Sequence, residues 1–160
     1  MEYDKHNVYI CYPDNWDFCE KGMNRIDGMI QISNGDGAFW MLKKYPSSQA
    51  PNDIANEVLA AMRLEYQDME VERVSEVMYD KFVTGFEMTF FYLDLMNEAR
   101  VLTFDTGLLT YAIFWQTGNQ LIIHADKEVP TDRVLDAITV SFLRGKINNK
   151  SKVEMKKNHK

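Results

Sequence analysis

The residues of this sequence whose types could do chemistry are few and scattered along the chain. His124 and Asp126 could form a general base, with the carboxylate orienting the imidazole. Residues two apart on a strand point to the same side, however, and a solvated histidine beside an acid is common. The other histidines, His6 and His159, lie in or beside chain ends that we expect to be flexible. We therefore assign no catalytic residue and predict that the protein is not an enzyme.

The two cysteines do not form a motif of redox or metal chemistry. Cys11 and Cys19 are eight positions apart and lack the C-x-x-C spacing of redox or zinc sites. Free cysteine is commonly buried and inert, which favours two reduced thiols in the core of a cytosolic protein. The polar, acidic start of the chain also favours a cytoplasmic location, because an export signal needs basic residues followed by an apolar run.

No metal, nucleotide or cofactor site is indicated by the spacing of polar residues. Asp36, Asp105 and Asp126 are each isolated at expected turns or strand ends, where aspartate bonds to the local backbone. The NGDG segment at 34–37 begins like a calcium loop, but AFWMLKKY follows it in place of further oxygen donors. The glycines are scattered and match no phosphate-binding loop. We expect no metal and no cofactor.

Charge is distributed unevenly between an acidic body and a basic tail. The segment Arg144–Lys160 holds seven Lys or Arg against Glu154 alone, a charge of +6. Because the whole chain of 160 residues carries −6, residues 1–143 carry −12. The tail has few apolar residues to bury, so we divide the chain into one domain, 1–143, and a flexible basic tail, 144–160. The tail has no aromatic residue to stack on bases, and we expect no nucleic acid as a partner.

The strand pattern predicts an α+β fold with a central antiparallel sheet. Val8–Tyr12 is rich in β-branched and aromatic residues and is stopped by Pro13. The glycines of NGDG supply the positive φ values of a hairpin between 27–33 and 38–45. Four apolar stretches separated by polar turns follow between residues 71 and 116, which predicts a meander that is covered at least partly on both sides.

Two helices are predicted by a change of hydrophobic period. From Pro51 onward, apolar residues recur every four positions, which indicates an amphipathic helix. Its stripe contains Ile54, Val58, Met62 and Tyr66. After a possible short strand at 120–125, a closing helix is expected with Thr131 as its N-cap.

Segments near the two ends of the domain carry a family resemblance. VYICYPDNWDF at Val8–Phe18 and AITVSF at Ala137–Phe142 resemble the opening YP.GW and closing I..SF segments of the PsbP-like and Mog-type superfamily. The resemblance would cover Val8–Leu143. It implies an αβα sandwich with helices flanking the sheet, in a group whose members mostly bind partners. One branch assists the water-oxidising photosystem and another binds the Ran GTPase, and no functional residue of either branch is implied here.

Together these patterns favour a non-catalytic module that engages another protein through one sheet face or its acidic surface. The alternatives are a secretion-type chaperone, a carrier of an apolar small molecule, or a hydrolase-like enzyme that uses His124 and Asp126. No membrane span is expected, because the longest apolar run, Leu108–Trp115, is too short. The candidate interaction residues come from the aromatic strands, the histidine and aspartate pair, and the tail: Trp40, Trp115, His124, Asp126, Lys156 and Lys157.

Removal of the tail tests the predicted domain boundary. A variant truncated after Leu143 should keep the melting temperature of the full chain, because residues 144–160 are expected to bury little apolar surface. Thermal unfolding followed by circular dichroism measures this. A melting temperature lower by more than about 5 °C would show that the folded domain extends beyond Leu143.

Overall fold

The computed structural model describes residues 1–118 and 130–145. The strands in this part of the chain are β1 (Glu2–Lys5), β2 (Val8–Cys11), β3 (Asp17–Lys21), β4 (Met29–Ser33), β5 (Phe39–Pro46), β6 (Glu70–Met78), β7 (Lys81–Tyr92), β8 (Leu95–Asp105) and β9 (Leu109–Gln116). The helices are α1 (Pro51–Glu65) and α2 (Thr131–Leu143), and neither is long and apolar enough to span a membrane. The strand considered at 120–125 and the tail from residue 146 lie outside the described residues.

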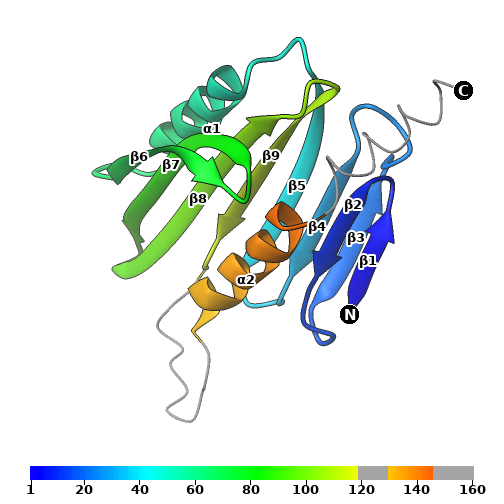
Figure 1. Cartoon of the computed structure of the whole chain (residues 1–160). Helices are drawn as coiled ribbons and strands as arrows, with labels where there is room; N and C mark the ends of the chain where they lie inside the picture. Colours follow the sequence, from blue (N-terminus) through cyan, green and yellow to red (C-terminus); the bar gives the residue numbers. More distant parts are fainter. Residues whose placement is uncertain (119–129, 146–160) are drawn as a thin grey trace, which may run out of the picture.

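Seven of the strands form one antiparallel sheet in the order β3-β4-β5-β9-β8-β7-β6, and β1 pairs with β2 in a separate hairpin (Figure 1). The predicted hairpin of β4 and β5 and the predicted meander from β6 to β9 are confirmed. Strand β5 pairs with β9. This pairing joins strands β3 to β5, which precede α1 in the chain, to strands β6 to β9, which follow it.

The sheet is covered on both faces, with one helix on each. On β8 the side chains of Leu102 and Phe104 belong to one apolar cluster and those of Ala99 and Val101 to another, as alternation along a strand requires. The first cluster includes buried residues of α2 and of the β1–β2 hairpin, and the second includes those of α1. We call these sides the α2 face and the α1 face. The predicted α+β class with a central antiparallel sheet is confirmed.

Helix α1 begins where the sequence predicts. Pro51 lies in its first turn, where the missing N–H costs no hydrogen bond, and Asp53 lies near the positive end of the helix dipole. Ile54, Leu59 and Met62 are buried. The apolar stripe of the sequence therefore faces the protein interior.

Helix α2 begins one residue earlier than the sequence suggests. Pro130 is the N-cap, without a side-chain hydrogen bond, and Thr131 is already helical, so the prediction of Thr131 as N-cap is wrong. The proline ring holds φ at −61°, which suits the extended residue before a helix. At the other end, the buried ammonium group of Lys81 donates to the Leu143 carbonyl at 2.6 Å. This contact places a cation at the negative end of the helix dipole.

The sequence does not predict β1 or β3, whose residues are mostly exposed. A turn at His6 and Asn7, both with positive φ, folds β1 back onto β2, so the expectation of a flexible start is wrong. Cys11 is partly buried, but Cys19 on β3 is exposed, which contradicts its prediction as a core thiol. The reason is that β3 is an edge strand of the sheet, with little covering its residues.

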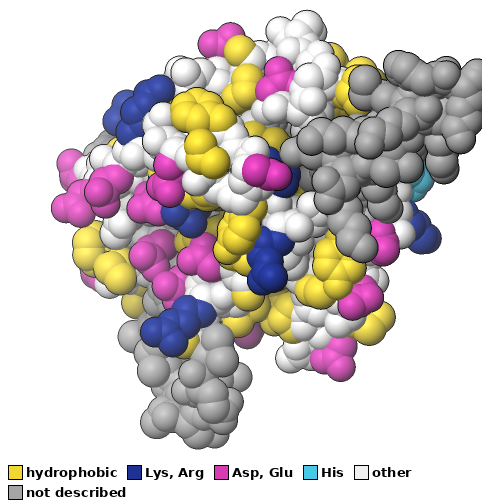
Figure 2. All heavy atoms as spheres, in the orientation of Figure 1, with side chains coloured by type: hydrophobic (Ala, Val, Ile, Leu, Met, Phe, Trp, Pro, Cys, Tyr) yellow, Lys and Arg dark blue, Asp and Glu magenta, His cyan; other side chains and the backbone are white. Residues whose placement is uncertain are grey.

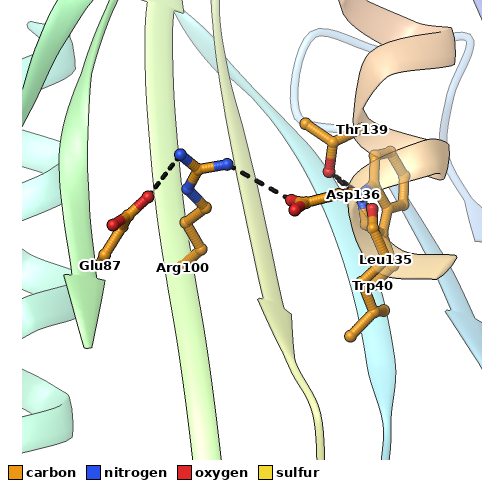
Figure 3. A network of polar contacts seen from close by, with 6 residues as sticks. All are labelled: Trp40, Glu87, Arg100, Leu135, Asp136 and Thr139. Carbon is orange, nitrogen blue, oxygen red and sulfur yellow. Dashed lines mark hydrogen bonds and ion pairs between the residues drawn. The ribbon is translucent and has the colours of Figure 1, made fainter. Parts of the chain in front are cut away.

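Trp40 joins α2 to the middle of the sheet (Figure 3). It is fully buried, and its indole N–H donates to the hydroxyl of Thr139 at 3.0 Å. The same hydroxyl donates to the Leu135 carbonyl at 2.9 Å. Phe142 approaches the indole edge-on, with ring centroids 6.5 Å apart. The helix is therefore held by an oriented hydrogen bond as well as by apolar packing.

Replacement of Thr139 by valine tests this junction. Thr139→Val keeps the shape of the side chain but leaves the buried Trp40 N–H without an acceptor, so we expect a loss of about 1 to 3 kcal/mol of unfolding free energy. Urea denaturation measures the loss. Thr139→Ser keeps the hydroxyl and should lose clearly less, and equal losses in the two variants would contradict a role for the hydrogen bond.

Candidate functional site

A row of cross-strand partners on the α2 face changes from aromatic to charged. The strand register pairs Trp40 with Trp115, Trp115 with Arg100, Arg100 with Glu87, and Glu87 with Glu72. Partners on one face have Cβ atoms about 4.5 to 5.5 Å apart, so each side chain can reach the next. The row thereby places residues from five strands side by side.

A cavity of about 510 Å³ lies over the charged end of this row, beside α2. Its acidic lining comes from strands β6, β7 and β8 and from α2: Glu70, Glu72, Glu87, Glu98, Asp132 and Asp136. Arg100 is the one basic residue in the described lining, and Trp115 also lines the cavity. Figure 2 shows acidic side chains gathered around basic ones over β6 to β8. Six carboxylates against one guanidinium make the cavity suited to a cation.

Arg100 lies between a strand and the helix (Figure 3). Its Nη2 is 2.5 Å from Oε2 of Glu87 on β7, and its Nη1 is 3.3 Å from Oδ1 of Asp136 on α2. The Arg100 side chain is only 20% exposed, so these ion pairs are less screened by water than pairs on the open surface. The guanidinium therefore neutralises part of the acidic lining and links α2 to the sheet.

The pKa values of two cavity carboxyls are raised, chiefly by burial. Burial raises the pKa of Glu98, and the nearby carboxylates of Asp132, Asp136 and Glu87 add to the shift. Burial also raises the pKa of Asp136, although Arg100 acts in the opposite direction. For both carboxyls burial is the largest cause of the raised pKa, and neighbouring carboxylates add to it.

Trp115 carries a buried hydrogen-bond donor that has no acceptor. The residue is 5% exposed, and its indole Nε1 has no hydrogen-bond partner among the described residues. Arg100 Nε is likewise buried and without a partner. A buried donor left unpaired costs about 1 to 3 kcal/mol, so two of them on neighbouring strands call for an explanation.

Two of the predicted interaction residues, Trp40 and Trp115, are neighbours in the fold but are not on its surface. Trp40 is 0% exposed, so its ring cannot contact a docked partner, and the structure does not support Trp40 as an interaction residue. Trp115 is 5% exposed and lines the cavity. The remaining four predicted residues lie outside the described part of the chain: His124, Asp126, Lys156 and Lys157.

Arg100, Glu87 and Asp136 are not singled out by any motif in the sequence. A signal does exist, because Glu87 and Arg100 are charged residues within largely apolar strands. Asp132 and Asp136 are four residues apart, which places them on one side of a helix. These hints point to polar surroundings for each residue, but they do not indicate that the residues share one cavity.

The described residues show no arrangement typical of metal binding. No group of three or more His, Cys, Asp or Glu side chains in this part of the chain is placed to hold a metal ion. A second cavity of about 480 Å³ lies between β2 and the end of α2. There the Tyr9 hydroxyl lies 3.0 Å from Cys11 Sγ, and Ser141 Oγ accepts from the Cys11 N–H at 2.9 Å. These contacts hold β2 against α2.

Comparison with known proteins assigns no family to this chain. No family profile and no curated protein matches it. Among solved structures it is similar to PA94 of Pseudomonas aeruginosa, a protein of unknown function, with 13% identity over 74% of this chain and 82% of that one, at a TM-score of 0.40. A second is a protein from Bacteroides thetaiotaomicron VPI-5482, with 11% identity, 84% and 43% coverage and a TM-score of 0.44. A third is LpqN, involved in cell envelope biogenesis of Mycobacterium tuberculosis, with 12% identity, 83% and 78% coverage and a TM-score of 0.47.

This chain therefore spans 43% of the length of the Bacteroides protein. Similarity at these levels says nothing about the function of the present chain.

Neutralisation of Glu98 tests the electrostatics of the cavity. Because the pKa of Glu98 is raised in the folded protein, its ionisation destabilises the fold at neutral pH, and this cost disappears below the unfolded-state pKa of about 4.3. Glu98→Gln should therefore raise the melting temperature at pH 7 by about 1 to 3 °C and have little effect near pH 4. Glu76→Gln, on the exposed part of β6 outside the cavity, is the control. An unchanged or lower melting temperature for Glu98→Gln at pH 7 would contradict the raised pKa of Glu98.

Proposed function

We propose that this protein is a non-catalytic binding module that engages a positively charged segment of a partner protein through the acidic cavity beside α2. The observation that carries the proposal is the convergence of six carboxylates around one guanidinium in a single cavity. Four of these carboxylates form no side-chain hydrogen bond or ion pair with the other described residues: Glu70, Glu72, Glu98 and Asp132. These four carboxylates are available to a ligand.

Partial burial makes Glu98 and Asp132 more effective than acids on an open surface, whereas Glu70 and Glu72 are exposed. Attraction between opposite charges grows as water is excluded, whereas fully exposed pairs contribute little. A cation in the cavity would also favour the charged form of Glu98, whose pKa is raised by burial and further by the neighbouring carboxylates. Binding a cation would therefore relieve unfavourable interactions that already exist in the free protein.

The polarity of the cavity also bears on the alternatives suggested by the sequence. A carrier of an apolar small molecule needs an apolar pocket, whereas charged groups dominate this one. The hydrolase-like alternative rests on His124 and Asp126, which lie outside the described residues. We therefore place the protein-binding module first and the other possibilities behind it.

A relationship to the PsbP-like and Mog-type superfamily is part of this proposal. It is supported by the order of elements, in which strands and a hairpin precede α1, a meander follows it, and α2 closes the domain. Partner binding is what the resemblance implies. The division into a domain of residues 1–143 with a basic tail and the cytoplasmic location stay predictions.

A peptide-binding experiment tests the proposed function. A fluorescein-labelled peptide of alternating lysine and glycine should bind the protein, and its glutamate counterpart should not. The double variant Glu72→Gln/Asp132→Asn should bind the lysine peptide about 10-fold more weakly, because it removes two unpaired carboxylates from the cavity. Fluorescence polarisation at two salt concentrations measures the affinities.

A matched variant separates a site from general acidity. Glu57→Gln/Glu65→Gln removes the same charge from exposed positions of α1, outside the cavity, and should leave binding nearly unchanged. Equal losses in the two double variants, or no binding of the lysine peptide by the unmodified protein, would contradict the proposal.

A further inference from the structure

Trp115 and Trp40 are cross-strand partners that differ in one respect. Both are buried on the α2 face, and Trp40 donates its indole N–H to Thr139 at 3.0 Å. The indole N–H of Trp115 has no partner in the part of the chain that the structure describes. The fold thus satisfies one tryptophan donor with a helix hydroxyl and leaves its neighbour unsatisfied where the cavity lies.

The unpaired Trp115 donor has a second donor beside it. Arg100 is its cross-strand partner on β8, and the Nε–H of Arg100 is also buried and unpaired, while both Nη atoms contact carboxylates. Both residues line the cavity, so an acceptor that enters it would meet these two donors once the atoms that now cover them move aside. The two N–H groups define an acceptor subsite.

The acceptor that suits this subsite is an uncharged oxygen. A carboxylate or phosphate would have to enter among the acidic side chains of Glu72, Glu98 and Asp132, which would repel it. An amide carbonyl accepts two hydrogen bonds and carries no net charge. The same acidic side chains attract a cation, so the fitting ligand carries both a neutral carbonyl and a positive group.

We propose that the cavity receives a lysine or arginine residue within a peptide chain. The cationic side chain of that residue lies among Glu72, Glu98 and Asp132, and a backbone carbonyl next to it accepts from Trp115 Nε1 and Arg100 Nε. A cavity of about 510 Å³ has room for one such residue with its flanking amide groups. This inference rests on the proposed function and specifies the part of the partner that is recognised.

Three small probes separate the two subsites. N-acetyl-lysine N-methylamide carries the cation and the carbonyls, n-butylamine carries only the cation, and N-acetyl-norleucine N-methylamide carries only the carbonyls. We expect the lysine amide to bind at least about 5-fold more tightly than either of the others, because only it fills both subsites. Titration followed by NMR of the indole N–H signals measures the affinities and reports on Trp115 directly.

The Trp115 indole signal reports directly on the acceptor subsite in the unmodified protein, once variants have assigned it. The chain has three tryptophans, so its indole N–H signals are few enough to resolve, and Trp115→Phe and Trp16→Phe assign two of them. The Trp115 proton should move downfield with the lysine amide and stay in place with n-butylamine. Trp115→Phe should lower the affinity for the lysine amide to that for n-butylamine, whereas Trp16→Phe, outside the cavity, should leave it unchanged.

The outcomes distinguish this inference from the function on which it rests. Equal affinities for the lysine amide and n-butylamine, with no shift of the Trp115 signal, would overturn the acceptor subsite while lysine-peptide binding still stands. Equal binding of the norleucine amide would overturn the cation subsite. If neither these probes nor the lysine peptide bind, the inference and the proposed function fail together.

Discussion

The candidate site depends on the two ion pairs that the guanidinium of Arg100 forms. This guanidinium is the one described cation in a lining of six carboxylates, and it contacts Glu87 on the sheet and Asp136 on α2. Without it these two acids would face each other across the cavity uncompensated, and the helix would be repelled from the strands. With it the cavity keeps its shape and still carries an excess of negative charge. One partly buried cation thus contributes to the fold and leaves the site attractive to another cation.

The position of the cavity follows from how the α2 face is covered. The β1–β2 hairpin and α2 pack with strands β4, β5 and β9 in one apolar cluster, and α1 covers the opposite face (Figure 1). On the α2 face, residues at one end of β6, β7 and β8 are polar where their neighbours along the strands are core residues. Each of these strands therefore contributes core residues along one part of its length and lining residues of the acidic cavity at one end.

Local patterns were sufficient for most of the fold. The turn at 34–37, the helix from Pro51 and the meander are each encoded by neighbouring residues, and each was predicted correctly. The polar strands β1 and β3 were missed because their exposed residues lack the apolar alternation that identifies a strand. The start of α2 was misplaced by one residue because threonine is a common N-cap, whereas here Pro130 takes that position.

The sequence by itself determined the class of the fold, the acidity of the body and the absence of familiar catalytic motifs, since these depend on composition and on residues close together in the chain. Only the tertiary structure decided that Glu72, Glu87, Arg100 and Trp115 share one row and that α2 brings Asp136 to it. The physical reason is strand register, because a shift of one residue would turn each of these side chains to the opposite face. The unpaired donor of Trp115 is likewise a property of packing, since nothing in the sequence distinguishes it from Trp40.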